Sequence, residues 1–531
     1  GKDGIHGATF SSEALDPASP VTAVQIGDPI TQKKFSDVIV KEARDLGYYN
    51  SITDNGAGGI SCSVAEMAKE CNGCRVMLDS VPLKYPGMAP WEIWISESQE
   101  RMTLAVPPEH IAQFMELMQR RDVEATVIGE FTDSGRCVVE YHGDVVMDIE
   151  LAFLHDGLPK KQLKTTYTKK LYPEPDTPCP ERLDSTMKSM LQRRNICSKE
   201  FISIQYDHAV QGGHVLGPLQ GRGRVQADAS LIKVVPGSKK GVGLSQGMFP
   251  SYSEIDPCRM AGAGIDTAVR GLIALGIPID KIAILDNFCW CSSDEPERLG
   301  QLKLAARGCY DVATAFGTPF ISGKDSMYND FSGFDADNNP VKISVPPTLL
   351  ISSIGVHDDV TRAVSMDAKI DGDLVYSIGA TAEELGGSEY FAHLGFAGNT
   401  VPGLDAAKMK ERYGRMTEAI RHGLVASAFP VTHGGLGIAL AKVAIAGRLG
   451  MDITIPAGMR PDHYLFSESL GRFVVTVAPD NKRAFERALG NDAHLIGRVR
   501  GTSLRITQDR TVIDLPVSEL EDSYKAPFGR Y

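Results

Sequence analysis

The sequence predicts an α/β protein built from layered α+β domains, with one type of domain present twice. Short runs of β-branched and aromatic residues alternate with stretches whose apolar residues recur at helical spacing, which favours stacked layers of helices and strands. Ser96-Glu97-Ser98, followed by Arg101, recurs as Ser467-Glu468-Ser469, followed by Arg472. Both blocks continue into a helix-like stretch and then an apolar run that ends in glycine. We therefore expect a duplicated domain, called C-type below.

Composition narrows the classes of function. The chain has 531 residues, 43% of them hydrophobic and 23% charged, which is typical of a globular protein of several domains. It lacks the run of about 18 apolar residues that a membrane helix requires. A net charge of -12 disfavours nucleic acid and anionic membranes as partners. Ten cysteines in a chain of this length suit a reducing, cytoplasmic location rather than a disulfide framework.

Four segments are expected along the chain: a first C-type domain at 1–155, a linker at 156–182, a different, N-type domain at 183–368, and a second C-type domain at 369–531. The linker is rich in lysine and in proline, which withholds backbone donors from regular structure. If the repeated unit is an N-type domain followed by a C-type domain, this chain starts at the second member of the series. A first N-type domain is then expected upstream of Gly1, absent from this chain.

Helices and strands can be placed around the motifs. In the first copy, apolar residues share one helical face in two stretches: Phe35, Val38, Ile39 and Leu46, and then Ile111, Phe114, Met115 and Met118. The N-type domain is expected to contain β-rich runs near 225–235 and 241–246, a helix opening at Asp256-Pro257, a strand at 282–285, a helix at 297–316 and a strand ending near Gly323.

A glycine-rich turn is the first candidate for chemistry. Asp54-Asn55-Gly56-Ala57-Gly58-Gly59 follows an expected strand and precedes a helix-like run. Glycines allow close backbone approach, a helix N-terminus offers N–H groups to an anion, and Asp54 is a hard oxygen donor suited to Mg²⁺. The alternative is a structural turn in which Asp54 caps the helix.

Two further clusters are polar. Glu97-Ser98-Gln99 interrupts the apolar run 91–95, and these residues could contact ribose or an amide or simply mark a strand end. Asp286 follows one expected strand, and Gly323-Lys324-Asp325-Ser326 ends another. Ligands of α/β domains gather at the carboxyl ends of strands, so these residues form a plausible nucleotide constellation. The second cluster is not a P-loop, because no glycine stands five residues before it.

The ordered motifs resemble those of the phosphoribosylformylglycinamidine synthases. The resemblance runs nearly end to end and rests on Gly1–Phe10, Val24–Pro29, the Asp54 turn, Ser96–Met102, Gln205–His208, Leu285–Asn287 and Ser322–Tyr328. It implies the aminoimidazole ribonucleotide synthetase-like fold, present twice in pseudo-twofold arrangement. It also implies a ligase that uses ATP, Mg²⁺ and glutamine-derived ammonia to convert formylglycinamide ribonucleotide into formylglycinamidine ribonucleotide through an iminophosphate.

Roles follow from the resemblance position by position. The implied substrate contacts are Gln25, Glu97, Ser98, Gln99 and Ser326, the implied ATP contacts are Asp286 and Gly323, and the implied magnesium ligand is Asp54. Lys324 stands where shorter family members have a magnesium-binding Asn, so either Asp325 replaces it or that contact is absent. Thr432-His433 stands where an acid would bind an auxiliary magnesium, which argues against a second nucleotide site.

The resemblance places the catalytic histidine in the absent upstream segment, so this chain alone is expected to be inactive. Its expected partners are that segment, a glutaminase subunit and a small accessory subunit. Two alternatives stay open: a kinase of the same superfamily with another acceptor, such as thiamine monophosphate kinase or selenophosphate synthetase, and a non-catalytic scaffold that binds nucleotide.

Overall fold

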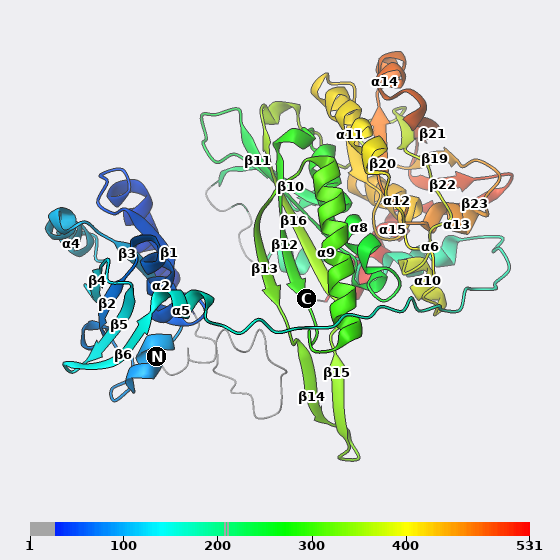
Figure 1. Cartoon of the computed structure of the whole chain (residues 1–531). Helices are drawn as coiled ribbons and strands as arrows, with labels where there is room; N and C mark the ends of the chain where they lie inside the picture. The colour runs from blue at the N-terminus through cyan, green and yellow to red at the C-terminus, as the bar shows by residue number, and fades with distance from the viewer. Residues whose placement is uncertain (1–26, 206–208, 210–211, 531) are drawn as a thin grey trace. The chain divides into compact units, whose positions relative to one another are not determined.

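The computed structural model describes residues 27–205, 209 and 212–530. The chain forms two compact units, which are described separately (Figure 1). Unit 1 comprises residues Gly1–Leu163 and Met327–Ser344, and unit 2 comprises Lys164–Ser326 and Val345–Tyr531. Among the described residues, no helix combines the length and apolar character that a bilayer crossing would require.

The described part of unit 1 contains three sheets, one of four strands and two of two strands, the last being a separate hairpin. Strand β1 pairs with β3, and four strands form a second sheet in the order β4-β2-β5-β6. Its elements are α1 (Pro29–Val38), the π-helix η3 (Ile39–Ala43), β1 (Ser51–Asp54), α2 (Gly59–Cys71), β2 (Cys74–Met77), α3 (Pro90–Ile95), β3 (Met102–Ala105), α4 (Ile111–Arg120), β4 (Gly129–Phe131), β5 (Arg136–Tyr141), β6 (Asp144–Glu150), α5 (Leu151–Asp156) and the hairpin β14 (Asp330–Phe334) and β15 (Pro340–Ser344).

The two predicted helical faces of unit 1 meet in one core. Val38 and Ile39 pack in the same buried cluster as Phe114 and Met118. Leu46 does not belong to this face, because the helix has ended before it and its side chain is 54% exposed. The shared apolar stripe therefore predicted the packing of α1 and η3 against α4, but not where η3 ends.

The N-type part of unit 2 is a six-stranded sheet in the order β13-β12-β16-β11-β10-β7. Its main elements are β7 (His214–Leu216), β10 (Ala229–Ile232), β11 (Gly241–Met248), α8 (Pro257–Ala274), β12 (Ile282–Cys289), α9 (Pro296–Phe316), β13 (Phe320–Ser326) and β16 (Thr348–His357). Helix α8 opens as predicted, with Asp256 as N-cap accepting a hydrogen bond from the Arg259 amide. Strands β12 and β13 both extend beyond their predicted ends, so the polar motifs lie within the ladder rather than after it.

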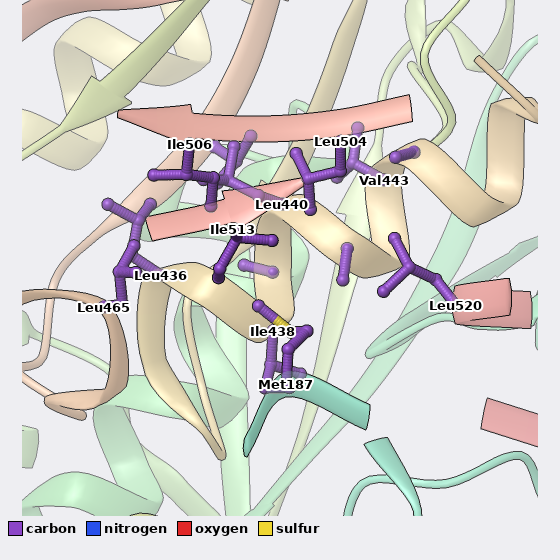
Figure 2. Close-up of a cluster of buried hydrophobic side chains, with 14 of the residues drawn as sticks. Met187, Leu436, Ile438, Leu440, Val443, Leu465, Leu504, Ile506, Ile513 and Leu520 are labelled. Carbon is purple, nitrogen blue, oxygen red and sulfur yellow. The ribbon is translucent and has the colours of Figure 1, made fainter. Parts of the chain in front are cut away.

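The C-type part of unit 2 is one seven-stranded sheet in the order β18-β20-β17-β21-β19-β22-β23. Its elements are β17 (Leu374–Ile378), α10 (Glu389–Leu394), α11 (Ala406–Arg421), β18 (Ser427–Pro430), α12 (Gly435–Gly447), β19 (Met451–Thr454), α13 (Pro461–Phe466), β20 (Phe473–Val477), α14 (Lys482–Leu489), β21 (Ala493–Val499), β22 (Ser503–Thr507), β23 (Thr511–Pro516) and α15 (Val517–Lys525). Every residue of α12 is buried, and Figure 2 shows its Leu440 and Val443 gathered with Leu504 of β22 in the core.

The duplication is visible element by element. The ladder β1–β3 corresponds to β18–β20, and both are antiparallel. The parallel pair β2–β5 corresponds to β19–β22, and each is flanked by an antiparallel partner, β6 and β23 respectively. Helices α2 and α12 both have 13 residues. A layered α/β fold with two C-type copies is therefore confirmed.

Residues 157–183 contain no helix or strand and connect α5 to α6 (Asp184–Leu191). From Thr166 onward the segment is fixed to unit 2 by hydrogen bonds, including Thr166 N–H to the Pro296 carbonyl at 3.0 Å and Tyr172 N–H to Asn399 Oδ1 at 2.8 Å. The three boundaries between the four expected segments stay a prediction.

Candidate functional site

The turn after β1 places Asp54 at the N-terminal end of α2. Asp54 is exposed, and its Oδ1 accepts a hydrogen bond from Gly56 N–H at 3.0 Å. The helix N-cap is Gly58, whose φ of 83° lies in the left-handed region that favours glycine. The idea that Asp54 caps the helix is therefore wrong. Among the described residues none donates to Asp54 Oδ2, so this oxygen can bind a ligand.

The turn lies directly against the segment that carries Glu97, Ser98 and Gln99. A Cβ on Gly59 would lie 2.1 Å from the Ser96 carbonyl oxygen, so only glycine permits this approach. The Asn55 amide N–H also donates to the Arg101 carbonyl at 3.2 Å. Two of the predicted motifs of unit 1 are thus brought together.

Arg101 holds the 96–99 segment in place. Its Nη2 donates to the Ser96 carbonyl, and burial lowers the pKa of Arg101 while the charge of Glu97 opposes that change. Glu97, Ser98 and Gln99 are half-buried. They follow a helix, α3, and not the strand end considered above, because Pro90 at its first turn and a Glu92 side chain bonded to Ala89 N–H start a helix there.

In unit 2, Asp286 and Gly323 are partners in the parallel ladder of β12 and β13. A Cβ on residue 323 would lie 2.3 Å from Asp286 Oδ1, so the carboxylate occupies the space above the glycine. Burial raises the pKa of Asp286, and the nearby charge of Asp325 acts in the same direction. Neither carboxylate forms an ion pair with a described residue. Carboxylate oxygens are ligands that a divalent cation prefers, but the described residues contain no group of three or more His, Cys, Asp or Glu side chains that could hold a metal ion by itself.

The remaining residues of the cluster divide between the two faces of β13. Side chains alternate along a strand, so Gly323 and Asp325 share a face with Asp286, whereas Lys324 and Ser326 point to the other. Lys324 Nζ donates to Ser326 Oγ at 3.0 Å, and Ser326 is buried. The structure therefore separates the carboxylates from the Lys–Ser pair that the sequence placed in one constellation.

The second C-type copy fills the equivalent place with its own side chain. Glu468, at the position of Glu97, is 2% exposed. Its Oε1 accepts from Gly434 N–H at 2.8 Å and Glu389 N–H at 3.0 Å, and its Oε2 accepts from Tyr252 Oη at 2.6 Å. An internal carboxylate thus occupies the N-terminus of α12.

The correspondence of Thr432-His433 with the magnesium acid is wrong. Asn55 N–H bonds the Arg101 carbonyl, and Val431 N–H bonds the Arg472 carbonyl, which fixes Asp54 opposite Pro430. Aligning the glycines of the two turns had suggested a correspondence between the copies that is displaced by several residues. The side chain of Pro430 has no donor atom for a metal, so this copy lacks the acid in either register.

Gln25 lies outside the described residues. Asn55 and Arg101, which join the two motifs of unit 1, were not identified as site residues from the sequence. For Arg101 a signal existed, because an arginine follows both Ser-Glu-Ser blocks at the same spacing. No such signal marks Asn55, because its counterpart in the second copy is Val431.

Comparison with known proteins places these motifs in a family. Residues 1–142 and 371–508 both match the family described as "AIR synthase related protein, C-terminal domain". The phosphoribosylformylglycinamidine synthase subunit PurL of Methanocaldococcus jannaschii is 33% identical over 100% of this chain and 72% of its own length. The Thermococcus gammatolerans protein of the same name is 34% identical over 98% of this chain and 70% of its own.

Solved structures agree in fold. Thermotoga maritima PurL complexed with FGAR (formylglycinamide ribonucleotide) has a TM-score of 0.65 at 21% identity, covering 94% of this chain and 70% of that one. The same protein complexed with ATP has a TM-score of 0.61 at 20% identity, covering 92% and 69%. The duplicated domains, the motif geometry and the relatives together show that the chain belongs to the PurL family of phosphoribosylformylglycinamidine synthase subunits.

Proposed function

We propose that the chain catalyses the ATP-dependent amidation of formylglycinamide ribonucleotide to formylglycinamidine ribonucleotide. ATP phosphorylates the amide oxygen to give an iminophosphate and ADP, and ammonia then displaces phosphate from the amide carbon. The observation that carries the proposal is the identity to named PurL subunits along the whole chain. Solved relatives are described as complexes with FGAR, ATP and ADP, which supports both substrates.

The residues of unit 1 suit the ribonucleotide. Glu97, Ser98 and Gln99 present carboxylate, hydroxyl and amide groups on a segment fixed by Arg101. Such groups can bind ribose hydroxyls and hold the reacting amide in a single orientation, which is how positioned contacts lower a barrier. Gln25 and Ser326 are proposed as further substrate contacts from the resemblance.

The carboxylates suit a magnesium nucleotide. Asp54 has an oxygen without a donor among the described residues, and Asp286 and Asp325 share a face without a basic partner there. Hard oxygen ligands of this kind are what Mg²⁺ prefers. Mg²⁺, when bound, would neutralise phosphate charge during phosphoryl transfer. Asp286, aligned over Gly323, would then be the ATP-binding group of unit 2.

The proposed reaction needs a source of ammonia. We propose that a glutaminase subunit supplies it, with a small accessory subunit in the assembly. The ten free thiols support a reducing compartment, and we propose a cytoplasmic location. A first N-type domain carrying the catalytic histidine stays part of this proposal.

The test is ADP release at saturating ammonium by the chain combined with its upstream N-type domain, with and without the ribonucleotide; the variants below are assayed in the same combination. Release that requires the ribonucleotide, and that falls at least tenfold in Asp54→Asn and in Asp286→Asn, is expected. Both variants keep the side-chain volume, so thermal unfolding should be unchanged. Release that is indifferent to the ribonucleotide would refute the ligase and favour another acceptor.

A further inference from the structure

A chain of buried hydroxyl and amide groups lies directly behind the Asp54 turn. Asn55, Thr103 and Ser63 are 6%, 8% and 0% exposed. Thr103 Oγ1 donates to Asn55 Oδ1 at 2.7 Å, and Ser63 Oγ lies 2.8 Å from Thr103 Oγ1. The three residues come from the turn, β3 and α2, so the chain connects all three elements around the site.

The second copy shows that the fold does not require these polar groups. Its corresponding residues are Val431, Val474 and Ala439, which are 0%, 1% and 2% exposed and belong to one apolar core. The same ladder, turn and helix form around them. Buried polar groups stabilise a protein less than well-packed apolar groups do, so their presence in the first copy calls for a reason other than folding.

The hydrogen bonds leave one group of this chain unused. Oδ1 of Asn55 accepts the hydrogen bond from Thr103, so Nδ2 lies on the other side of the amide. No described residue accepts a hydrogen bond from its two N–H donors. Asn55 is more than nine-tenths buried, yet its Nδ2 is not one of the fully buried polar atoms that lack a partner, so these donors reach the surface of the site, where a ligand can supply an acceptor. Asn55 also lies between the two motifs of unit 1, since its neighbour is Asp54 and its backbone N–H bonds Arg101.

We propose that the Asn55 side-chain amide is a substrate-binding group, donating to an acceptor oxygen of the ribonucleotide, and that Thr103 and Ser63 are positioning residues. The hydroxyl chain holds Oδ1 inward, which turns the donors of Nδ2 toward the ligand. This inference rests on the proposed function, since it names a further contact in the same site. In the second copy, which lacks the hydroxyl chain, Glu468 is buried and its oxygens accept hydrogen bonds from groups of the protein itself.

The decisive variant replaces the three polar residues of the first copy by their counterparts in the second copy. Asn55→Val with Ser63→Ala and Thr103→Val reproduces an apolar trio that already packs in this fold, so the melting temperature should be equal to or above that of the wild type. Calorimetric Kd for the ribonucleotide should rise about 10- to 100-fold, the range for a hydrogen bond to a charged or strongly polar group. The Kd for a non-hydrolysable ATP analogue should stay within about twofold.

Three single variants separate positioning from stability. Thr103→Val should weaken ribonucleotide binding about fivefold, and Thr103→Ser, which restores the hydroxyl, should recover it. The matched control is Thr476→Val in the second copy, where Thr476 Oγ1 forms a buried bond of 2.6 Å with Ser427 Oγ. It should lower the melting temperature as Thr103→Val does and leave the Kd unchanged.

The outcomes are distinct. A Kd unchanged in the triple variant and in Thr103→Val overturns the inference and leaves the proposed function standing. Weakening confined to the ATP analogue also overturns it, because the amide would then serve the nucleotide. A wild-type protein that does not bind the ribonucleotide refutes the proposed function itself.

Discussion

Gly323→Ala tests whether the Asp286 carboxylate must lie where the structure places it. The added Cβ would be 2.3 Å from Asp286 Oδ1, whereas ordinary contact begins at 3.4 Å, so the carboxylate must move by about 1 Å. A displacement of about 1 Å in a binding group can lower activity about 100-fold. Stability should hardly change, because β13 is an edge strand, residue 323 is exposed and only a side-chain end has to give way.

The assay is ribonucleotide-dependent ADP release as a function of ATP, together with thermal unfolding. We expect kcat/KM for ATP to fall about 100-fold at an unchanged melting temperature. Gly237→Ala is the control, since a Cβ there has nothing within 4 Å. Because both changes act through one carboxylate, Gly323→Ala should add little to Asp286→Ala. Full activity in Gly323→Ala, or losses that multiply in the double variant, would refute the reasoning.

Three further results are expected, the first being that Glu468→Gln flattens the pH dependence of stability. Burial raises the pKa of Glu468, so the wild type should lose stability as pH rises above about 4.5, a loss that melting curves across pH should not find in the variant. Burial lowers the pKa of His357, whose Nε2 bonds the Leu275 carbonyl; wild-type stability should therefore fall as pH drops below 6.5, and urea unfolding of His357→Gln should show a weaker fall. Leu440→Ala should reduce the free energy of unfolding by about 2–5 kcal/mol, since this side chain is fully buried; a denaturant midpoint equal to the wild type would contradict the packing in Figure 2.

Local sequence signals predicted much of the fold. The strand, the glycine turn and α2 follow from a short apolar run and from glycines that allow positive φ. Helix α8 was predictable from its Asp-Pro start. The run 91–95 was harder, because its four apolar and aromatic residues suit a strand or a short helix equally, and only the capping contacts of Glu92 decide between them.

Contacts between elements could not be predicted in the same way. The approach of Asp286 to Gly323 depends on the register of β12 and β13, which shifts between Ile284 and Leu285. No property of either motif reveals that shift. The residue-by-residue correspondence between the two C-type copies could not be predicted either, because their glycine turns can be aligned in several registers. The backbone bonds of Asn55 and Val431 settle it.

The arginines after the two Ser-Glu-Ser blocks have a consequence for how this molecule evolved. Arg101 and Arg472 both donate to the carbonyl of the first serine of their block, although one copy has a half-buried glutamate and the other an enclosed one. After a gene duplication, selection on the loop's shape and selection on its ligand can act separately. The two C-type copies of one chain can therefore be compared with each other. Residues that both copies share are those that the fold requires, and residues that differ are those that the chemistry of only one copy requires.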